Sequence, residues 1–205
     1  VYNEMVEAAD LVQVDFSMNI VRDSSLEIVK AFAGDINKTF EEAVKVAEEI
    51  YKIPVQNRAD MVFVSPGGFY FDNSLQEAAV CLDSALEIVK RGKAIALIAE
   101  CASGFGNKDF FEVISKYRNL RELKRRLEKR FTVPGLMAYR LMKVLQQVNI
   151  VVVSVMPEYA LSRILKLKIA RTANEAYRLL AERFGNRGKI SFIPYGNLTV
   201  PFIKT

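Results

Sequence analysis

The chain has 205 residues, 51% of them apolar, which is enough to bury an independent core. Its longest apolar runs, AIALIA and VNIVVVSVM, are far shorter than the ~20 residues of a membrane-spanning helix, so no membrane span is predicted. Histidine is absent, which excludes Ser–His, Cys–His and histidine-ligated metal mechanisms confined to this chain.

The first fifty residues predict an antiparallel hairpin followed by a helix. Residues 10–21 alternate as a strand does, and residues 24–34 follow a polar turn as the partner strand. Apolar side chains then recur at helical spacing from Asn37, with Asp35 or Asn37 as the N-cap, and Pro54 ends the helix.

The rest of the chain predicts strands that alternate with helices. Asn73 or Ser74 is expected to cap a helix that runs to Lys90, with Gly92 at its end, and Thr172 and Gly185 are expected to bound another. We expect strands at 61–65, 94–101, 149–156 and 189–194, and further helices at 108–115, 119–130 and 136–147. This order is typical of a Rossmann-like α/β fold, a mostly parallel sheet with helices on both faces, here after an N-terminal antiparallel hairpin. No linker interrupts it, so one domain over residues 1–205 is expected.

The two cysteines lie in unrelated contexts. Cys81 falls within a predicted helix and Cys101 ends a predicted strand, which indicates small core residues of a cytoplasmic protein and no disulfide. No metal-ligand spacing involves either cysteine, so no metal site is predicted in this chain.

A glycine turn follows the first parallel strand. In open α/β sheets, ligands bind beyond the carboxyl ends of the strands. The N–H groups of Gly67 and Gly68 could form a nest for a carboxylate or phosphate, or the two glycines could only permit a tight turn; both interpretations stay open.

Four polar residues open the next helix and form a candidate substrate-binding row: Asp72, Asn73, Gln76 and Glu77. Helical spacing lets their side chains point back toward the glycine turn. The alternative is that they cap the helix and stabilise its dipole.

A second glycine loop follows the second parallel strand. Glu100 ends that strand, and Gly104 and Gly106 follow it, as in α/β enzymes that place a ligand-orienting carboxylate there. The alternative is that Glu100 fixes the turn by bonding to loop N–H groups.

Residues 116–130 hold most of the surplus positive charge. Glu122 and Glu128 alternate with the basic residues at helical spacing, and only Tyr117 offers an aromatic platform. A solvated helix face is therefore predicted, with no nucleic-acid partner.

Several motifs together resemble the nickel-dependent lactate racemase family. They occur in the family's order and spacing along nearly the whole chain, which resembles the carboxyl-terminal part of those proteins. The motifs are Phe32–Asp35, Ala59–Asp60 leading into Val64–Gly68, Ala99–Cys101 with Gly104, Gly106 and Asn107, and Pro194–Gly196 with Thr199–Pro201.

The resemblance implies a division of labour. An amino-terminal domain, with the segment after it, would supply the histidines and lysine that hold a nickel–pincer nucleotide, to which the 2-carbon of a 2-hydroxy acid transfers a hydride reversibly. The carboxyl-terminal domain would close the cleft and hold the substrate. This chain would then contain no catalytic residue and bind no cofactor alone, and its partners would be the amino-terminal cofactor domain and a small 2-hydroxy acid. Because the first residue is Val1 and not methionine, we expect that the chain was processed or is a piece of a longer protein.

Departures from the family pattern indicate a substrate other than lactate. The family motif Asn-Leu-Tyr-Gln-x-x-Lys places its tyrosine, glutamine and lysine on Gln76, Glu77 and Val80. Valine cannot pair with a carboxylate, and ionised Glu77 would repel one. Tyr2 stands where the family has a nickel-ligand histidine, and Leu136 begins a segment that has lost a histidine and a lysine.

Two alternatives stay open beside a racemase or epimerase of this type. The first is a non-catalytic binding domain that kept the fold, favoured by the changes at Tyr2, Val80 and Leu136. The second is a generic nucleotide-binding α/β domain.

Overall fold

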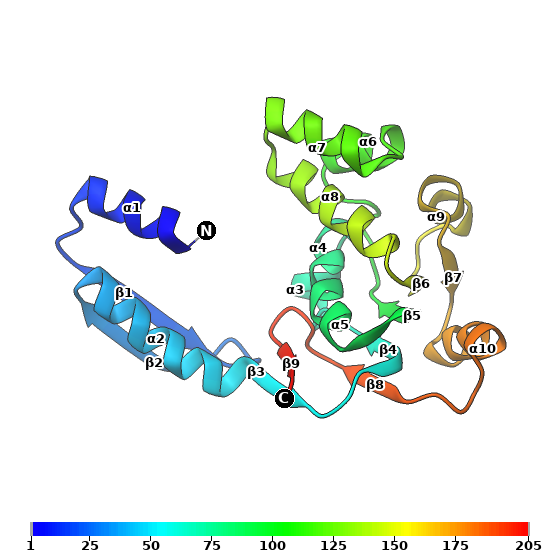
Figure 1. Cartoon of the computed structure of the whole chain (residues 1–205), viewed down its shortest axis with the longest axis horizontal. Helices are drawn as coiled ribbons and strands as arrows, with labels where there is room; N and C mark the ends of the chain where they lie inside the picture. The colour runs from blue at the N-terminus through cyan, green and yellow to red at the C-terminus, as the bar shows by residue number, and fades with distance from the viewer. Residues whose placement is uncertain (1, 205) are drawn as a thin grey trace. The chain divides into compact units, whose positions relative to one another are not determined.

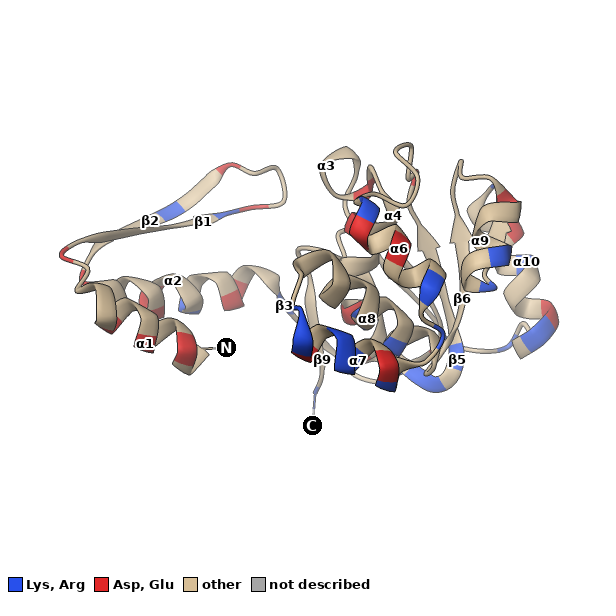
Figure 2. Cartoon of the chain, turned by 90° about the horizontal axis from the view of Figure 1, so that it is seen from above, with Lys and Arg blue, Asp and Glu red and all other residues tan. Residues whose placement is uncertain are grey.

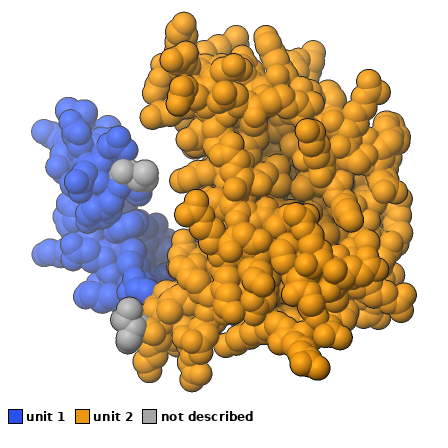
Figure 3. Space-filling view, turned by 45° about the vertical axis from the view of Figure 1, so that its right-hand side comes forward, with its two compact units in different colours: residues 1–53 blue, residues 54–205 orange. Residues whose placement is uncertain are grey.

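The chain forms two compact units, which differ from the single domain expected over residues 1–205. The computed structural model describes residues 2–204, and the units comprise residues 1–53 and 54–205 (Figure 3). The hairpin of the first unit packs on its own helix, so this segment does not extend the parallel sheet. The uninterrupted pattern of elements gave no sign of this boundary.

The first unit is a hairpin covered by a helix on one face. It contains α1 (Tyr2–Val12), β1 (Ser17–Arg22), β2 (Ile28–Gly34) and α2 (Ile36–Tyr51). Asp35 caps α2 as predicted, since its carboxylate accepts the Lys38 N–H at 3.0 Å. The strand expected over residues 10–21 was wrong at its start: residues 10–12 complete α1, and the left-handed backbone of Gln13 (φ 52°) follows that helix.

The second unit is a parallel α/β sheet. Its five strands are β4 (Ala59–Val64), β5 (Val89–Ile98), β6 (Asn149–Val153), β7 (Lys168–Ala170) and β8 (Ile190–Ile193). They lie in the order β7-β6-β5-β4-β8, and every neighbouring pair is parallel (Figure 1). β3 (Lys52–Val55) and β9 (Val200–Ile203) form a separate two-stranded sheet. The predicted mostly parallel α/β fold with an N-terminal antiparallel hairpin is confirmed.

Helices cover both faces of the five-stranded sheet. On one face, Val62, Ile95 and Val152 pack in a core with α5, α6, α8 and α9; on the other, Met61 and Ala96 pack with α10. The helices of the second unit are α3 (Phe69–Asp72), α4 (Leu75–Ala78), a 3₁₀ turn (Ala79–Cys81), α5 (Leu82–Ile88), α6 (Lys108–Lys116), α7 (Leu120–Lys129), α8 (Val133–Leu145), α9 (Glu158–Leu165) and α10 (Ala173–Phe184).

Some element boundaries differ from the prediction. The helix expected to reach Lys90 ends at Ile88 and is broken by the 3₁₀ turn, and Gly92 (φ 76°) lies inside β5, near an irregularity in its register with β4. α8 begins at Val133, because Pro134 fits the first turn of a helix and Thr132 caps it. Thr172 and Gly185 bound α10 as predicted.

The charged helix α7 is a partly solvated helix, as predicted. Basic and acidic positions both occur along α7 (Figure 2). Leu123 is fully buried, whereas Lys124 and Glu128 form an exposed ion pair at 3.9 Å. Arg126 turns inward to the carboxylate of Asp109 on α6. The positive charge of this helix is therefore partly balanced within the fold.

Candidate functional site at the carboxyl edge of the sheet

The strand order places a topological switch point between β4 and β8. The chain moves outward from β4 through β5 and β6 to β7 and then returns to the other side of β4. Ligands of open α/β sheets bind where the strand order reverses in this way, beyond the carboxyl ends of the strands. The loops after β4 and β8 are therefore the first place to look for a site.

Backbone hydrogen bonds join these two loops. Ser65 accepts the Gly196 N–H at 2.7 Å, and Pro66 accepts the Asn197 N–H at 3.2 Å. From α5, the Ser84 hydroxyl lies 2.8 Å from the carbonyl oxygen of Gly196 and 2.7 Å from that of Thr199. The motif that follows β8 is thus fixed against the end of β4.

The first glycine turn has the backbone that only glycine adopts easily. Gly67 and Gly68 have φ of 120° and 94°, and a Cβ on Gly67 would lie 3.3 Å from the Tyr195 ring. Among residues 2–204, no acceptor pairs with the N–H groups of these two glycines. The tight turn is real, and its two amides remain available for an anion.

The second glycine loop lies against the segment that follows the first. Cys101 and Ser103 donate backbone N–H groups to the carbonyls of Asp72 and Asn73, both at 2.8 Å. In return, Leu75 donates to the carbonyl of Gly104 at 2.9 Å. The structure therefore brings together the two loops that the sequence analysis singled out.

Gly106 is required by space as well as by backbone conformation. It has φ of 96°, and a Cβ there would lie 2.9 Å from Ser74 Oγ and 3.0 Å from Gln76 Cβ. We expect Gly106→Ala to lower the free energy of unfolding by about 2 kcal/mol. Gly104→Ala is the control, because Gly104 (φ 68°) has no atom within 4 Å and should lose only about 1 kcal/mol. Urea unfolding of both variants measures the difference, and equal losses would contradict the close contact at Gly106.

Three side chains of the candidate substrate row make structural hydrogen bonds. Gln76 Oε1 accepts the Asn107 N–H at 3.0 Å, and its Nε2 lies 3.3 Å from Met137 Sδ. Asn73 Oδ1 accepts the Ser103 hydroxyl at 3.1 Å. Glu77 Oε2 accepts the Ser74 hydroxyl at 2.9 Å, and the Glu77 N–H donates to the same hydroxyl at 3.3 Å, by which Ser74 caps α4.

This edge of the sheet is acidic around Cys101. Burial, together with the nearby carboxylates of Asp72, Glu77 and Glu100, raises the pKa of the Cys101 thiol to about 12. Burial likewise raises the pKa of Cys81. A raised pKa keeps both thiols protonated near neutral pH, which disfavours a role as a nucleophile there.

Arg171 is a candidate binding residue that the sequence analysis missed. It follows β7 directly, and its Nη1 donates to the carbonyls of Ser154 at 3.0 Å and Met156 at 3.3 Å. Ser154 in turn donates its hydroxyl to the carbonyl of Glu100 at 2.6 Å. The only sign of Arg171 in the sequence was its place directly after β7, and that three-residue strand was itself not predicted.

Exposed aromatic side chains at this edge were also missed. Parallel strands end at one edge of their sheet, so the loops that follow them gather there. Phe69 and Tyr70 follow the first glycine turn, Tyr159 opens α9, and Tyr195 follows β8; all four are exposed. Phe69 and Tyr70 contact each other, with ring centroids 6.0 Å apart, and contiguous exposed apolar patches mark surfaces that bind a ligand or partner. In the sequence, the sign of these aromatic residues was their position in the segments that follow the predicted strands.

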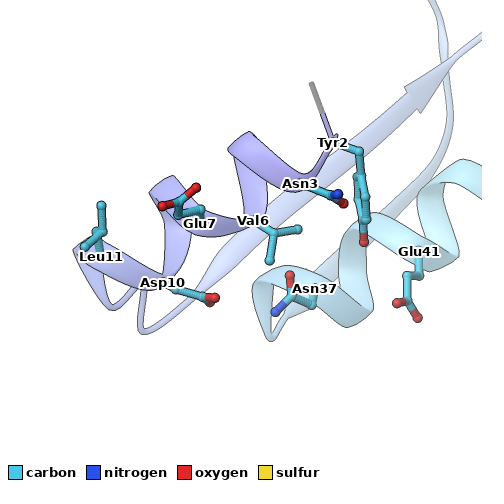
Figure 4. Close-up of a pocket in the computed structure, with 8 residues that line it drawn as sticks. All are labelled: Tyr2, Asn3, Val6, Glu7, Asp10, Leu11, Asn37 and Glu41. Carbon is cyan, nitrogen blue, oxygen red and sulfur yellow. The ribbon is translucent and has the colours of Figure 1, made fainter.

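The described residues do not fit a nickel centre. Residues 2–204 contain no group of three or more histidine, cysteine, aspartate or glutamate side chains that could hold a metal ion. Tyr2 lines an open groove of about 690 Å³ between α1 and α2 (Figure 4). Its ring stacks on that of Phe40, with centroids 5.7 Å apart. The groove is lined by Tyr2, Asn3, Val6, Glu7, Asp10, Leu11, Asn37 and Glu41. Its donors are hard oxygen atoms, so no step through nickel is assigned to this chain.

No helix in the described part of the chain has the length and apolar character needed to cross a membrane.

A parallel sheet with helices on both faces and glycine loops at the carboxyl ends of β4 and β5 defines a Rossmann-like α/β class. Within it, residues 54–200 match the family model described as Lactate racemase C-terminal domain. The chain belongs to this family, and the match begins at the boundary between the two units.

Two similar proteins are lactate racemases. The one from Thermoanaerobacterium thermosaccharolyticum is 26% identical over 200 residues, and the one from Lactiplantibacillus plantarum is 23% identical over 203 residues. Each alignment covers 96% of this chain and 47% of the relative. The chain therefore spans about half the length of these relatives.

Solved structures confirm the fold. The lactate racemase apoprotein from Thermoanaerobacterium thermosaccharolyticum superposes with a TM-score of 0.87 at 24% identity, covering 98% of this chain and 48% of that one. A Thermotoga maritima protein superposes with a TM-score of 0.61 at 15% identity, covering 92% of this chain and 49% of that one.

Proposed function

We propose that this chain is the carboxyl-terminal portion of a lactate-racemase-like isomerase that racemises or epimerises a 2-hydroxy acid. The observation that carries the proposal is the family match over residues 54–200 in a chain that spans about half of its relatives. A nickel–pincer nucleotide would be held by an amino-terminal half, because this chain lacks histidine and residues 2–204 offer no group of three or more metal-ligating side chains. The isolated chain would then be inactive.

The role of this chain would be to bind and orient the substrate. The free N–H groups of Gly67 and Gly68 suit a carboxylate, and Arg171 supplies a cation at the same edge of the sheet. The proposed substrate contacts are Gln76, Glu77, Asp72 and Asn73, with Glu100 beside them. The apolar Val80 and the acidic row favour a 2-hydroxy acid other than lactate.

Ligand binding tests this proposal on the chain as it is. A 2-hydroxy acid that binds the folded state raises the melting temperature, and a concentration of 100 times Kd adds about 2.7 kcal/mol to the free energy of unfolding. We expect some members of a panel of 2-hydroxy acids to raise the melting temperature and ATP, NAD and FMN to leave it unchanged. A shift with nucleotides alone would instead support a generic nucleotide-binding domain.

A non-catalytic interaction domain is the second candidate. It is favoured by the structural hydrogen bonds of Gln76, Asn73 and Glu77, which already use the side chains proposed to hold the substrate. This candidate predicts that no 2-hydroxy acid shifts the melting temperature.

Glu77→Gln separates the structural role of Glu77 from its charge. The glutamine side-chain oxygen can still accept the Ser74 hydroxyl, and the backbone N–H of residue 77 keeps its bond to Ser74, so we expect the free energy of unfolding to change by less than about 0.5 kcal/mol. Loss of one negative charge near a bound carboxylate should raise the affinity for D-lactate about fivefold, since such a repulsion is worth about 1 kcal/mol. Calorimetric titration measures the affinity, with the exposed Glu112→Gln on α6 as control. An unchanged affinity would remove Glu77 from the binding site.

A further inference from the structure

Apolar side chains fill one face of the first unit's hairpin up to the irregularity in register before Arg22. Cross-strand partners in an antiparallel pair point to the same side of the sheet. Met18 pairs with Ala33 and Ile20 with Ala31, and Val29 continues the alternation of β2 at an irregularity in the register. We call this the outer hairpin face, and its residues are Met18, Ile20, Val29, Ala31 and Ala33.

The opposite face of the same hairpin is already covered. Ser17 Oγ and Thr39 Oγ1 of α2 are 2.7 Å apart, and Asn19 donates to the same Thr39 oxygen at 3.0 Å. Val21, on this side of the sheet, is buried. The side facing α2 thus combines the polar Ser17 and Asn19 with buried Val21, whereas the exposed outer side is apolar, the reverse of a sheet whose outer side meets solvent.

All five residues of the outer hairpin face are exposed within the described structure. Met18 is 61% exposed, Val29 49% and Ile20 44%. In residues 2–204, β1 and β2 have no other strand neighbours, so each also leaves one edge unpaired. This face and these edges therefore need a cover.

The ranges over which the relatives match this chain indicate what covers the outer hairpin face. The family model starts at residue 54, whereas the lactate racemases align over 96% of this chain, so the first unit has a counterpart in them outside the carboxyl-terminal domain. The other half of each relative has no counterpart here. The first unit is therefore the part of this chain that belongs with that other half.

We propose that the outer hairpin face is the docking surface for the amino-terminal half of a lactate-racemase-like protein. The inference rests on the proposed function, in which such a half holds the cofactor. Apolar side chains of the amino-terminal half would cover Met18, Ile20 and Val29, and its strands could pair with the free edges of β1 or β2.

Co-purification tests the docking surface. This chain is co-produced with the tagged amino-terminal half of the Thermoanaerobacterium thermosaccharolyticum lactate racemase, and the amount retained on the tag is measured. Ile20→Lys and the double variant Met18→Lys, Ile20→Lys are compared with Val44→Lys, a control at a 38% exposed apolar residue of α2. Circular dichroism of each variant alone verifies that the hairpin variants and the control are equally folded.

The expected result is that the chain is retained, that Ile20→Lys lowers retention at least about tenfold, and that Val44→Lys does not. Failure of the unchanged chain to co-purify, or equal retention of all variants, would overturn the proposal. So would a dimer of this chain, detected by light scattering and lost in Ile20→Lys, since a second copy would then cover the face. A complex that forms as expected but isomerises no 2-hydroxy acid would contradict the proposed function and leave the docking surface intact.

Discussion

Gly196→Ala is expected to lower the free energy of unfolding by about 3 kcal/mol. Among the glycines of the loops after β4 and β8, this substitution should cost the most. A Cβ at Gly196 would lie 2.6 Å from Cys81 Cβ and 2.6 Å from Val64 Cγ2. Both neighbours are fully buried, so neither has room to move. Displacing the loop instead would strain the hydrogen bonds to Ser65 and Ser84.

Urea unfolding followed by circular dichroism measures this loss. Gly185→Ala is the control, because Gly185 has φ of 82° with no atom within 4 Å of an added Cβ, and it should lose about 1 kcal/mol through its backbone alone. The account of a closed junction between the loops after β4 and β8 fails if Gly196→Ala is as stable as the unchanged chain.

Asp109→Ala is expected to lower the free energy of unfolding by about 2 to 3 kcal/mol. The carboxylate of Asp109 on α6 accepts from Arg126 Nη2 of α7 at 2.6 Å and from the hydroxyl of Thr132, the N-cap of α8, at 2.5 Å. Loss of the carboxylate leaves the partly buried Arg126 guanidinium without its counter-charge. Thermal and urea unfolding measure the effect on the three-helix layer.

The same carboxylate predicts a pH dependence. The Thr132 hydroxyl, followed by the charge of Arg126, lowers the pKa of Asp109 below its ordinary value. The stabilisation is therefore complete above the pKa of the unfolded chain, near 3.9, and is lost as the pH falls through the lower folded pKa. Asp109→Asn should lose stability relative to the unchanged chain at pH 7, and the difference should shrink below about pH 4. A difference that does not change with pH would contradict the ion pair.

The sequence was sufficient for the order of the parallel sheet elements and for both glycine loops. Buried strands such as residues 149–153 are continuous apolar runs, and caps such as Asp35 and Thr172 mark helix starts locally. The short strands β3, β7 and β9 were missed, because three or four residues carry too little periodicity to be distinguished from a loop.

The environment of the site could not be predicted from local sequence. The bond from Gln76 to the Asn107 N–H and that from Asn73 to Ser103 join residues about thirty positions apart, and they depend on how the two loops pack. Arg171 reaches the carbonyls of Ser154 and Met156 only because β6 and β7 are neighbours in the sheet. The apolar outer hairpin face likewise depends on the register of β1 and β2.

Chiral analysis of 2-hydroxy acids tests the central claim most directly. Enantiomerically pure acids are incubated with this chain alone, with the amino-terminal half of a related lactate racemase produced together with the enzymes that make its cofactor, and with both, and the nickel content is measured alongside. The account predicts that at least one acid is interconverted only when both halves are present, with nickel retained by the assembled protein. Interconversion by this chain alone, or none by a nickel-loaded complex of both halves, would contradict it.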